Sequence, residues 1–211
     1  MDAAEQACLH PGGTELTARL MAGASLHAGA SVLDAGCGAG HTVAWLLQQG
    51  YDACGIDLQP LSERAEICQG SLQQLPYQLE RFDAVLSECT AFICGDTQAM
   101  LQECCRVLKQ DGWLMLSDVY FDETKPLPFF ADGRPVTMGQ WQHLLAQCGF
   151  QVQVVEDASA FWKPFVLEQL WAGRTLEELW GAVCPDLGQN ACGGYKPGYF
   201  LLWARKQCSP A

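Results

Sequence analysis

Residues 31–40 constrain the fold of this chain more than any other segment, because a short apolar run there leads directly into three closely spaced glycines. The glycines stand at alternate positions, 36, 38 and 40, and a helical pattern of apolar residues follows over residues 41–49. A strand, a glycine turn and a helix start place bare backbone beside the unpaired N–H groups of a helix N-terminus. The segment therefore predicts a binding site for a nucleotide-like ligand.

Further strands and helices alternate along the chain, which predicts a parallel sheet covered on both faces. The last strand follows a turn at 193–199 instead of a crossover helix, so we expect it to be antiparallel. Residues 120–136 predict a long surface loop, and Thr14 and Thr137 are the expected N-caps of two helices. The expected strands are 31–35, 53–58, 66–69, 82–88, 113–119, 150–156 and 199–205, and the expected helices are 14–24, 41–49, 61–65, 97–108, 138–147 and two within 160–183.

Composition excludes several classes of protein. Hydrophobic residues make up 49% of the 211 and charged residues 17%, which is typical of a packed globular chain. The formal net charge of −12 and the lack of a basic run argue against nucleic-acid partners. The first residues carry no secretory signal, and no stretch approaches the roughly 18 to 20 apolar residues of a membrane span. We expect a cytoplasmic protein without membrane contacts.

The 12 cysteines include no Cys-x-x-Cys pair, so no structural metal site is predicted. In a cytosolic protein such residues are mostly free, buried thiols that behave as small apolar side chains. A functional role for one or more of them stays open. Cys89 and Cys94 follow the strand at 82–88, where apolar lining of a pocket is favoured over a site for a soft metalloid.

Four predicted strands end in residues suited to a ligand site, and ligands bind beyond the carboxyl ends of parallel strands. Asp57 lies 21 positions after Gly36, where a carboxylate can accept hydrogen bonds from both hydroxyls of a ribose. A dinucleotide fingerprint would place its third glycine at position 41, which is His41. Asp34, just before the turn, suits a ligand with a positive amine or sulfonium better than a pyrophosphate. A nicotinamide-dependent oxidoreductase is therefore the weaker alternative.

These residues carry a resemblance to a known family. The segment 32–40 resembles the first motif of class I S-adenosylmethionine-dependent methyltransferases, and Asp57 is similar to their acidic residue after the second strand. Residues 82–85 resemble the fourth-strand motif. Residues 106–114 resemble the helix-to-strand signature of the ubiquinone/menaquinone-biosynthesis type. The resemblance covers residues 31–120.

The resemblance implies an α/β fold, namely a three-layer doubly wound Rossmann-like sandwich with a seven-stranded, mostly parallel sheet whose last strand is antiparallel. One methyltransferase domain, 1–211, would comprise an N-terminal helical lid (1–30), a cofactor-binding core (31–120) and a substrate-side half (121–211) with a helical insertion at about 160–193. For the helix at 14–24, two alternatives stand side by side: its preceding Pro-Gly-Gly loop belongs to a lid, or the helix merely covers a sheet edge.

The cofactor implied is S-adenosyl-L-methionine. Its methionine part would lie against residues 36–38 near Asp34, its ribose on Asp57, and its adenine beside Leu58. Members often carry an aspartate after strand three that bonds the adenine amino group; Ser71 stands there instead and makes a weaker bond. The expected cofactor-binding residues are Asp34, Gly36, Cys37, Gly38, Gly40, Asp57, Leu58, Ser71, Leu72 and Glu88.

The implied reaction is methyl transfer to a small-molecule acceptor, with a non-catalytic S-adenosylmethionine-binding relative as the alternative. Such a transfer depends mainly on bringing donor and acceptor together in a water-poor pocket, and a base is needed only if the acceptor loses a proton. Glu88, His10 and Asp118 are candidates for that base, and none is preferred. His41 is interpreted as structural, and His27 and His143 as surface residues. The acceptor pocket is expected from residues 11–13, 89–94, 120–135 and 162–180.

Overall fold

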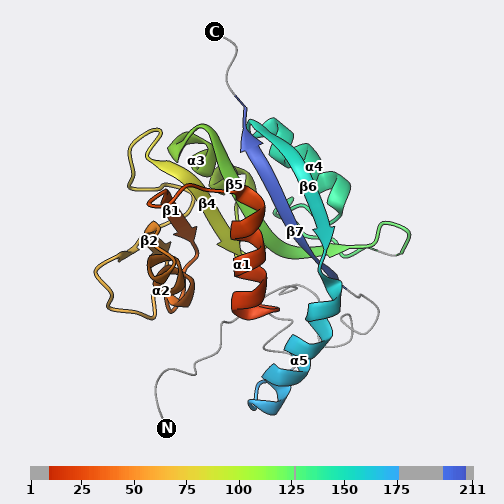
Figure 1. Cartoon of the computed structure of the whole chain (residues 1–211). Helices are drawn as coiled ribbons and strands as arrows, with labels where there is room; N and C mark the ends of the chain where they lie inside the picture. Colours follow the sequence, from red (N-terminus) through yellow and green to blue (C-terminus); the bar gives the residue numbers. More distant parts are fainter. Residues whose placement is uncertain (1–9, 126, 176–196, 208–211) are drawn as a thin grey trace.

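The computed structural model describes residues 10–125, 127–175 and 197–207. A seven-stranded sheet runs through the molecule in the order β3-β2-β1-β4-β5-β7-β6 (Figure 1). β7 pairs antiparallel with both β5 and β6, while the other paired strands are parallel. This confirms the predicted sheet. Its strands are β1 (Ser31–Ala35), β2 (Asp52–Asp57), β3 (Ile67–Gln69), β4 (Phe82–Glu88), β5 (Leu108–Phe121), β6 (Phe150–Asp157) and β7 (Pro197–Lys206).

Helices cover the sheet in two layers. The helices are α1 (Gly13–Ala24), α2 (His41–Gln48), α3 (Thr97–Val107), α4 (Met138–Gln147) and α5 (Trp162–Trp171), with a short 3-10 turn η1 (Ser159–Phe161) before α5. α1 contacts α2 on one face, and the thiol of Cys148 after α4 donates to the Gln98 carbonyl of α3 on the other. α5 and the start of α1 both lie toward the carboxyl ends of β1 and β4 (Figure 1). The edge predicted to hold a ligand is therefore flanked by these two helices.

Burial explains why the central strands are continuous apolar runs. All five residues of β1 are buried, and β4 is buried except at Asp83. A strand covered by helices on both faces requires such a run. Near the C-terminal end of the described chain, Phe200, Leu201 and Leu202 of β7 are fully buried as well, so the core extends from β1 to β7.

Three local predictions were wrong. Residues 61–65 form no helix, because five residues are too few to offset the cost of helix nucleation, and the Leu61 amide instead donates to the Gly38 carbonyl. Thr14 is not an N-cap: Gly12 occupies that position in a left-handed conformation, φ 73°. The boundary between the helix expected at 97–108 and the strand expected at 113–119 was misplaced, because β5 already starts at Leu108 and bulges before Trp113.

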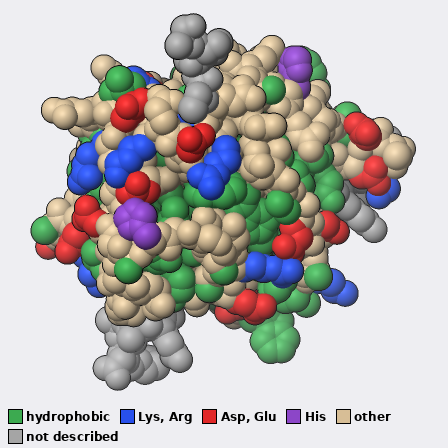
Figure 2. Space-filling view, turned by 45° about the horizontal axis from the view of Figure 1, so that its top comes forward, with side chains coloured by type: hydrophobic (Ala, Val, Ile, Leu, Met, Phe, Trp, Pro, Cys, Tyr) green, Lys and Arg blue, Asp and Glu red, His purple; other side chains and the backbone are tan. Residues whose placement is uncertain are grey.

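The helix α1 does not cover a sheet edge, since it packs on the inner strands β5 and β7. The second helix expected within 160–183, and the turn at 193–199 apart from its last residues, lie outside the described residues. Within the part of the chain that is described, no helix has the length and apolar character needed to cross a membrane. On the face shown in Figure 2, basic side chains lie among acidic ones.

Candidate functional site

The glycine turn after β1 adopts backbone angles that favour glycine. Gly36, Gly38 and Gly40 have φ values of 91°, 48° and 75°. A Cβ on Gly36 would lie 2.3 Å from the Thr90 hydroxyl, whereas one on Gly38 would meet no atom within 4 Å. Gly36 is thus required by packing, and the backbone at Gly38 faces open space that a ligand can enter.

A cavity of about 230 Å³ adjoins this turn. Its walls come from the end of β1, the start of α2 and the end of β4 with the segment after it. His10, just before the loop at residues 11–12 that leads into α1, completes the lining. Five of the predicted cofactor-binding residues line it: Asp34, Gly36, Cys37, Gly38 and Glu88. His41 also lines it, although the sequence had suggested a structural role. The structure therefore brings the glycine turn and two carboxylates together.

Asp34 supplies a buried carboxylate with one oxygen, Oδ2, that accepts no hydrogen bond from the described residues. Asp34 is 3% exposed. Burial, and then the negative charges of Glu88 and Asp57, raise the pKa of Asp34 well above its ordinary value. A positive group in the cavity would satisfy this oxygen and favour the charged carboxylate.

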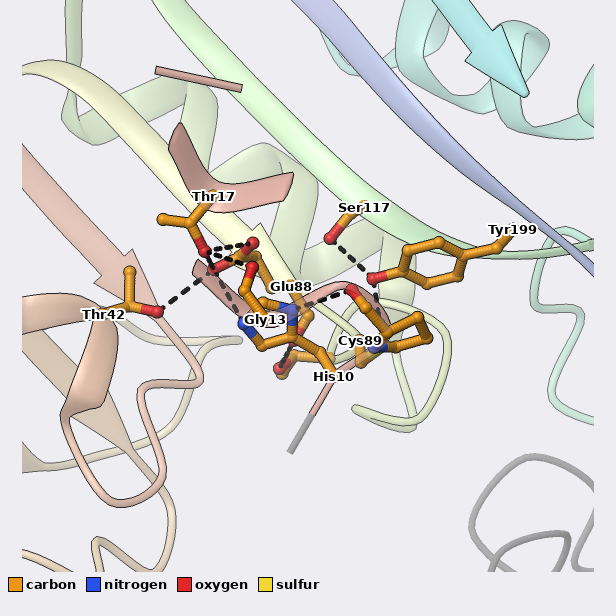
Figure 3. A network of polar contacts seen from close by, with 10 residues as sticks. His10, Gly13, Thr17, Thr42, Glu88, Cys89, Ser117 and Tyr199 are labelled. Carbon is orange, nitrogen blue, oxygen red and sulfur yellow. Dashed lines mark hydrogen bonds and ion pairs between the residues drawn. The ribbon is translucent and has the colours of Figure 1, made fainter. Parts of the chain in front are cut away.

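Glu88 is held by a polar network contributed by three elements (Figure 3). The Thr17 hydroxyl of α1 lies 3.1 Å from both carboxylate oxygens, and the Thr42 hydroxyl of α2 donates to Oε2 at 3.2 Å. Nε2 of His10 lies 3.5 Å from the same oxygen. Burial raises the pKa of Glu88 and outweighs the lowering effects of His10 and the two hydroxyls.

Sequence reasoning missed both threonines. One signal could have found Thr17: it stands next to Leu16 and one turn before Leu20 and Met21, on the apolar side of the predicted helix. A polar residue on such a face requires a partner inside the protein. No comparable signal marks Thr42, because its proximity to Glu88 depends on how β4 lies beside α2.

Asp57 lies beside the cavity without lining it. Its carboxylate accepts the Gly38 and Gln59 amides, each at 2.9 Å, and so fixes the glycine turn to the end of β2. Each carboxylate oxygen can accept more than one hydrogen bond, so both retain capacity for a ligand hydroxyl. Leu58, next in the chain, is 64% exposed, so its side chain is accessible to a ligand.

The remaining predicted residues lie further from the cavity. A Cβ on Gly40 would lie 2.2 Å from Ile67 Cδ1, so a side chain here would displace Ile67, and the φ of 75° also favours glycine. The Ser71 hydroxyl donates to Gln73 Oε1 and accepts the Gln73 amide, and Leu72 is buried. The Gly70 amide donates to the Asp57 carbonyl, which places the segment with Ser71 next to the end of β2.

Of the three candidate bases, the structure brings two together. His10 and Glu88 line the cavity, but Asp118 does not, and its carboxylate accepts the Phe92 and Val119 amides instead. His27 and His143 are exposed, as expected.

Cysteines contribute no metal site to the described residues. All described cysteines are free thiols, each buried or half-buried, and no group of three or more His, Cys, Asp or Glu side chains there could hold a metal ion. Cys89 lines the cavity, and its Sγ lies 3.3 Å from the Tyr199 hydroxyl, whereas the Cys94 thiol donates to the Ala91 carbonyl. The two thiols therefore point to different partners.

Comparison with known proteins agrees with this geometry. The model of a methyltransferase domain family matches residues 33–116. The protein named "uncharacterized methyltransferase YodH" of Bacillus subtilis (strain 168) is 31% identical over 163 residues, which is 67% of this chain and 69% of the relative. The [4+2]-cyclase SpnF has a similar fold, with a TM-score of 0.72 and 23% identity over 92% of this chain and 81% of its own.

A second solved structure is geranyl diphosphate C-methyltransferase of Streptomyces coelicolor A3(2), in complex with Mg²⁺, geranyl diphosphate and S-adenosyl-L-homocysteine. Its TM-score is 0.71, with 13% identity over 92% of this chain and 79% of its own. At these identities the two structures show the fold alone, and the ubiquinone/menaquinone subtype stays a prediction. The family itself follows from the match to the Bacillus protein together with the motif-bearing residues of the cavity. This chain belongs to the class I S-adenosylmethionine-dependent methyltransferases.

Proposed function

We propose that this protein transfers a methyl group from S-adenosyl-L-methionine to a small-molecule acceptor. The observation that carries the proposal is the unpartnered Oδ2 of Asp34 beside the bare backbone of Gly38 in one cavity. S-adenosylmethionine has an ammonium and a sulfonium, so its positive charges complement Asp34 and Glu88. A pyrophosphate would instead be repelled by the same carboxylates.

Each part of the cofactor has a candidate partner. Asp34 holds the amino group of the methionine part of the cofactor. The backbone amides near Gly38 lie against the same methionine part. Asp57 accepts the ribose hydroxyls while it continues to hold the glycine turn. The exposed Leu58 covers one face of the adenine, and Ser71 with the Leu72 amide reaches its edge.

The bound cofactor supplies an electrophilic methyl group. The protein contributes position: Glu88, with its threonine partners, ties α1 and α2 to the end of β4 and so fixes one wall of the cavity. Orientation of two reactants can supply about 7 to 11 kcal/mol of the barrier. The acceptor is a small molecule because the described cavities near this edge are of small-molecule size, about 230 and 390 Å³.

Calorimetric titration with S-adenosylhomocysteine tests the proposal. We expect saturable binding, weakened in Asp57→Ala by the loss of hydrogen bonds to a charged group, about 1.5 to 3 kcal/mol. Asp52→Ala is the matched control, because Asp52 begins the strand that Asp57 ends. Heat with NADH but none with S-adenosylhomocysteine would support the oxidoreductase alternative and refute the proposal. Equal affinity of Asp57→Ala and wild type would refute the ribose assignment alone.

A further inference from the structure

A second cavity adjoins the first. It has a volume of about 390 Å³ and lies between the segment that begins α1 and the segment η1–α5. His10 lines both cavities, so the two are neighbours on either side of this residue. A Cβ on Gly12 would lie 3.1 Å from Phe161 Cδ1, which shows how closely the α1 loop approaches the start of α5. An acceptor placed here would be next to the cofactor cavity.

The charged groups of this second cavity are acidic. Glu15 and Glu168 are its charged lining residues, and neither forms an ion pair within the described chain. Among the described residues that line it, there is no Lys or Arg. Glu88 lies just beyond His10, and the whole chain carries a formal charge of −12. The field in this cavity therefore favours a cation and repels a carboxylate or phosphate.

The other walls are apolar and aromatic. Phe161, Pro164 and Phe165 line the cavity, and the Phe165 ring centroid lies 6.2 Å from that of Trp162. Aromatic faces attract an ammonium group and also pack against an apolar ligand body. The cavity thus combines negative charge at its polar positions with an apolar wall.

A buried nitrogen provides a second, independent indication of a ligand. His10 is 8% exposed, and its Nε2 has no hydrogen-bond partner among the described residues. Nδ1 lies 3.3 Å from the Pro11 carbonyl, which can only accept, so in the tautomer that donates to this carbonyl Nε2 carries the lone pair of the neutral ring. Protonation of Nε2 would create an imidazolium 3.5 Å from the Glu88 carboxylate.

We propose that the acceptor is a primary or secondary amine with an apolar body, bound between α1 and α5, and that His10 takes its proton. The ammonium gives one proton to Nε2 of His10, which leaves a lone pair on the amine nitrogen. That pair forms the new C–N bond as the C–S bond breaks, and the C–S electron pair returns to sulfur and neutralises the sulfonium. This inference rests on the proposed methyl transfer and names its substrate class.

Three probes of similar shape test the substrate class: 2-phenylethylamine, 2-phenylethanol and phenylacetate, each titrated into protein saturated with S-adenosylhomocysteine. We expect the amine to bind at least about tenfold more tightly than the alcohol and the acid to bind most weakly. With S-adenosylmethionine, mass spectrometry should detect N-methylated product from the amine. Equal binding of the three probes, a preference for the acid, or no methylated amine would overturn the proposal.

Charge variants locate the site. Glu15→Gln combined with Glu168→Gln should weaken amine binding about tenfold and leave S-adenosylhomocysteine affinity unchanged. Asp52→Asn removes one charge at the opposite end of β2 and should change neither affinity. Unchanged amine affinity in the double variant would overturn the location.

His10→Asn tests the proton transfer. Loss of a general base should lower kcat for the amine about 100-fold or more, while amine affinity stays close to wild type. An unchanged kcat would overturn the role of His10. S-adenosylhomocysteine binding is measured for every variant, so failure of the proposed function (no binding) is distinct from failure of this inference (binding without amine preference).

Discussion

Asp118 illustrates at the scale of one residue how burial decides the role of a carboxylate. The sequence places it near the end of a strand, where it is a candidate base. In the structure it is 2% exposed, and it accepts the Phe92 amide at 2.9 Å and the Val119 amide at 2.8 Å. Burial raises the pKa of Asp118 to about 7 despite these bonds. Asp118 therefore holds the segment that follows β4 in place. Glu88 and His10, and not Asp118, line the cavity.

This pKa predicts a pH dependence of stability. Between the ordinary value of 3.8 and about 7, the folded protein retains the Asp118 proton and the unfolded chain does not. The folded state then binds more protons, so the free energy of unfolding falls as pH rises through this range, by at most ~4 kcal/mol from this group. Urea unfolding at pH 4.5 to 7.5 should show a smaller decrease for Asp118→Asn than for wild type. Parallel curves for the two proteins would contradict the prediction.

At the scale of elements, the starts of α4 and α1 show when a cap can be recognised from sequence. Thr137 was predicted as the N-cap of α4, and it forms a complete capping box with Gln140. The same reasoning failed at Thr14, because Gly12 and Gly13 take positive φ values and begin α1 earlier. An N-cap can therefore be predicted from sequence where no nearby glycine allows the helix to start at an earlier residue.

The two threonines give a matched test. Thr137→Ala removes a hydrogen bond to the Gln140 amide and should lower the free energy of unfolding by about 1 kcal/mol. Thr14→Ala removes an exposed side chain that caps no helix, so its effect should stay within about 0.5 kcal/mol. Urea unfolding measures both. A larger loss in Thr14→Ala than in Thr137→Ala would show that the cap of α1 is misassigned.

On the scale of the whole molecule, the first helix and the last strand depend on one another. The Trp203 indole of β7 donates to the Leu20 carbonyl of α1 at 2.8 Å, and Trp203 packs against Gly23 so closely that a Cβ there would lie 2.4 Å from its Nε1. α1 also contains Thr17, whose hydroxyl donates a hydrogen bond to the Glu88 carboxylate. The C-terminal strand thus supports the helix whose Thr17 holds Glu88 at the cavity.

Gly23→Ala should disturb this contact. The added methyl overlaps a buried tryptophan, and overpacking of this kind costs typically about 1 to 3 kcal/mol. Gly139→Ala is the control: its methyl would come no closer than 3.9 Å to Thr137 Oγ1, and alanine is the better helix former, so stability should stay equal or rise. Thermal unfolding of both variants checks this, and a stable Gly23→Ala protein would argue against the close packing of α1 on β7.

The sequence by itself determined the sheet and the glycine turn. Apolar runs bounded by turns, and glycines at positive φ, are local requirements that a strand, a helix start or a tight turn imposes on nearby residues. Only the tertiary structure decided which distant side chains meet. Thr17 and Thr42 donate to Glu88, Asp118 accepts the Phe92 amide and does not line the cavity, and His10 lines two cavities. All of these contacts join residues that are far apart in sequence. Such contacts depend on how helices pack on the sheet, which no short segment of sequence encodes.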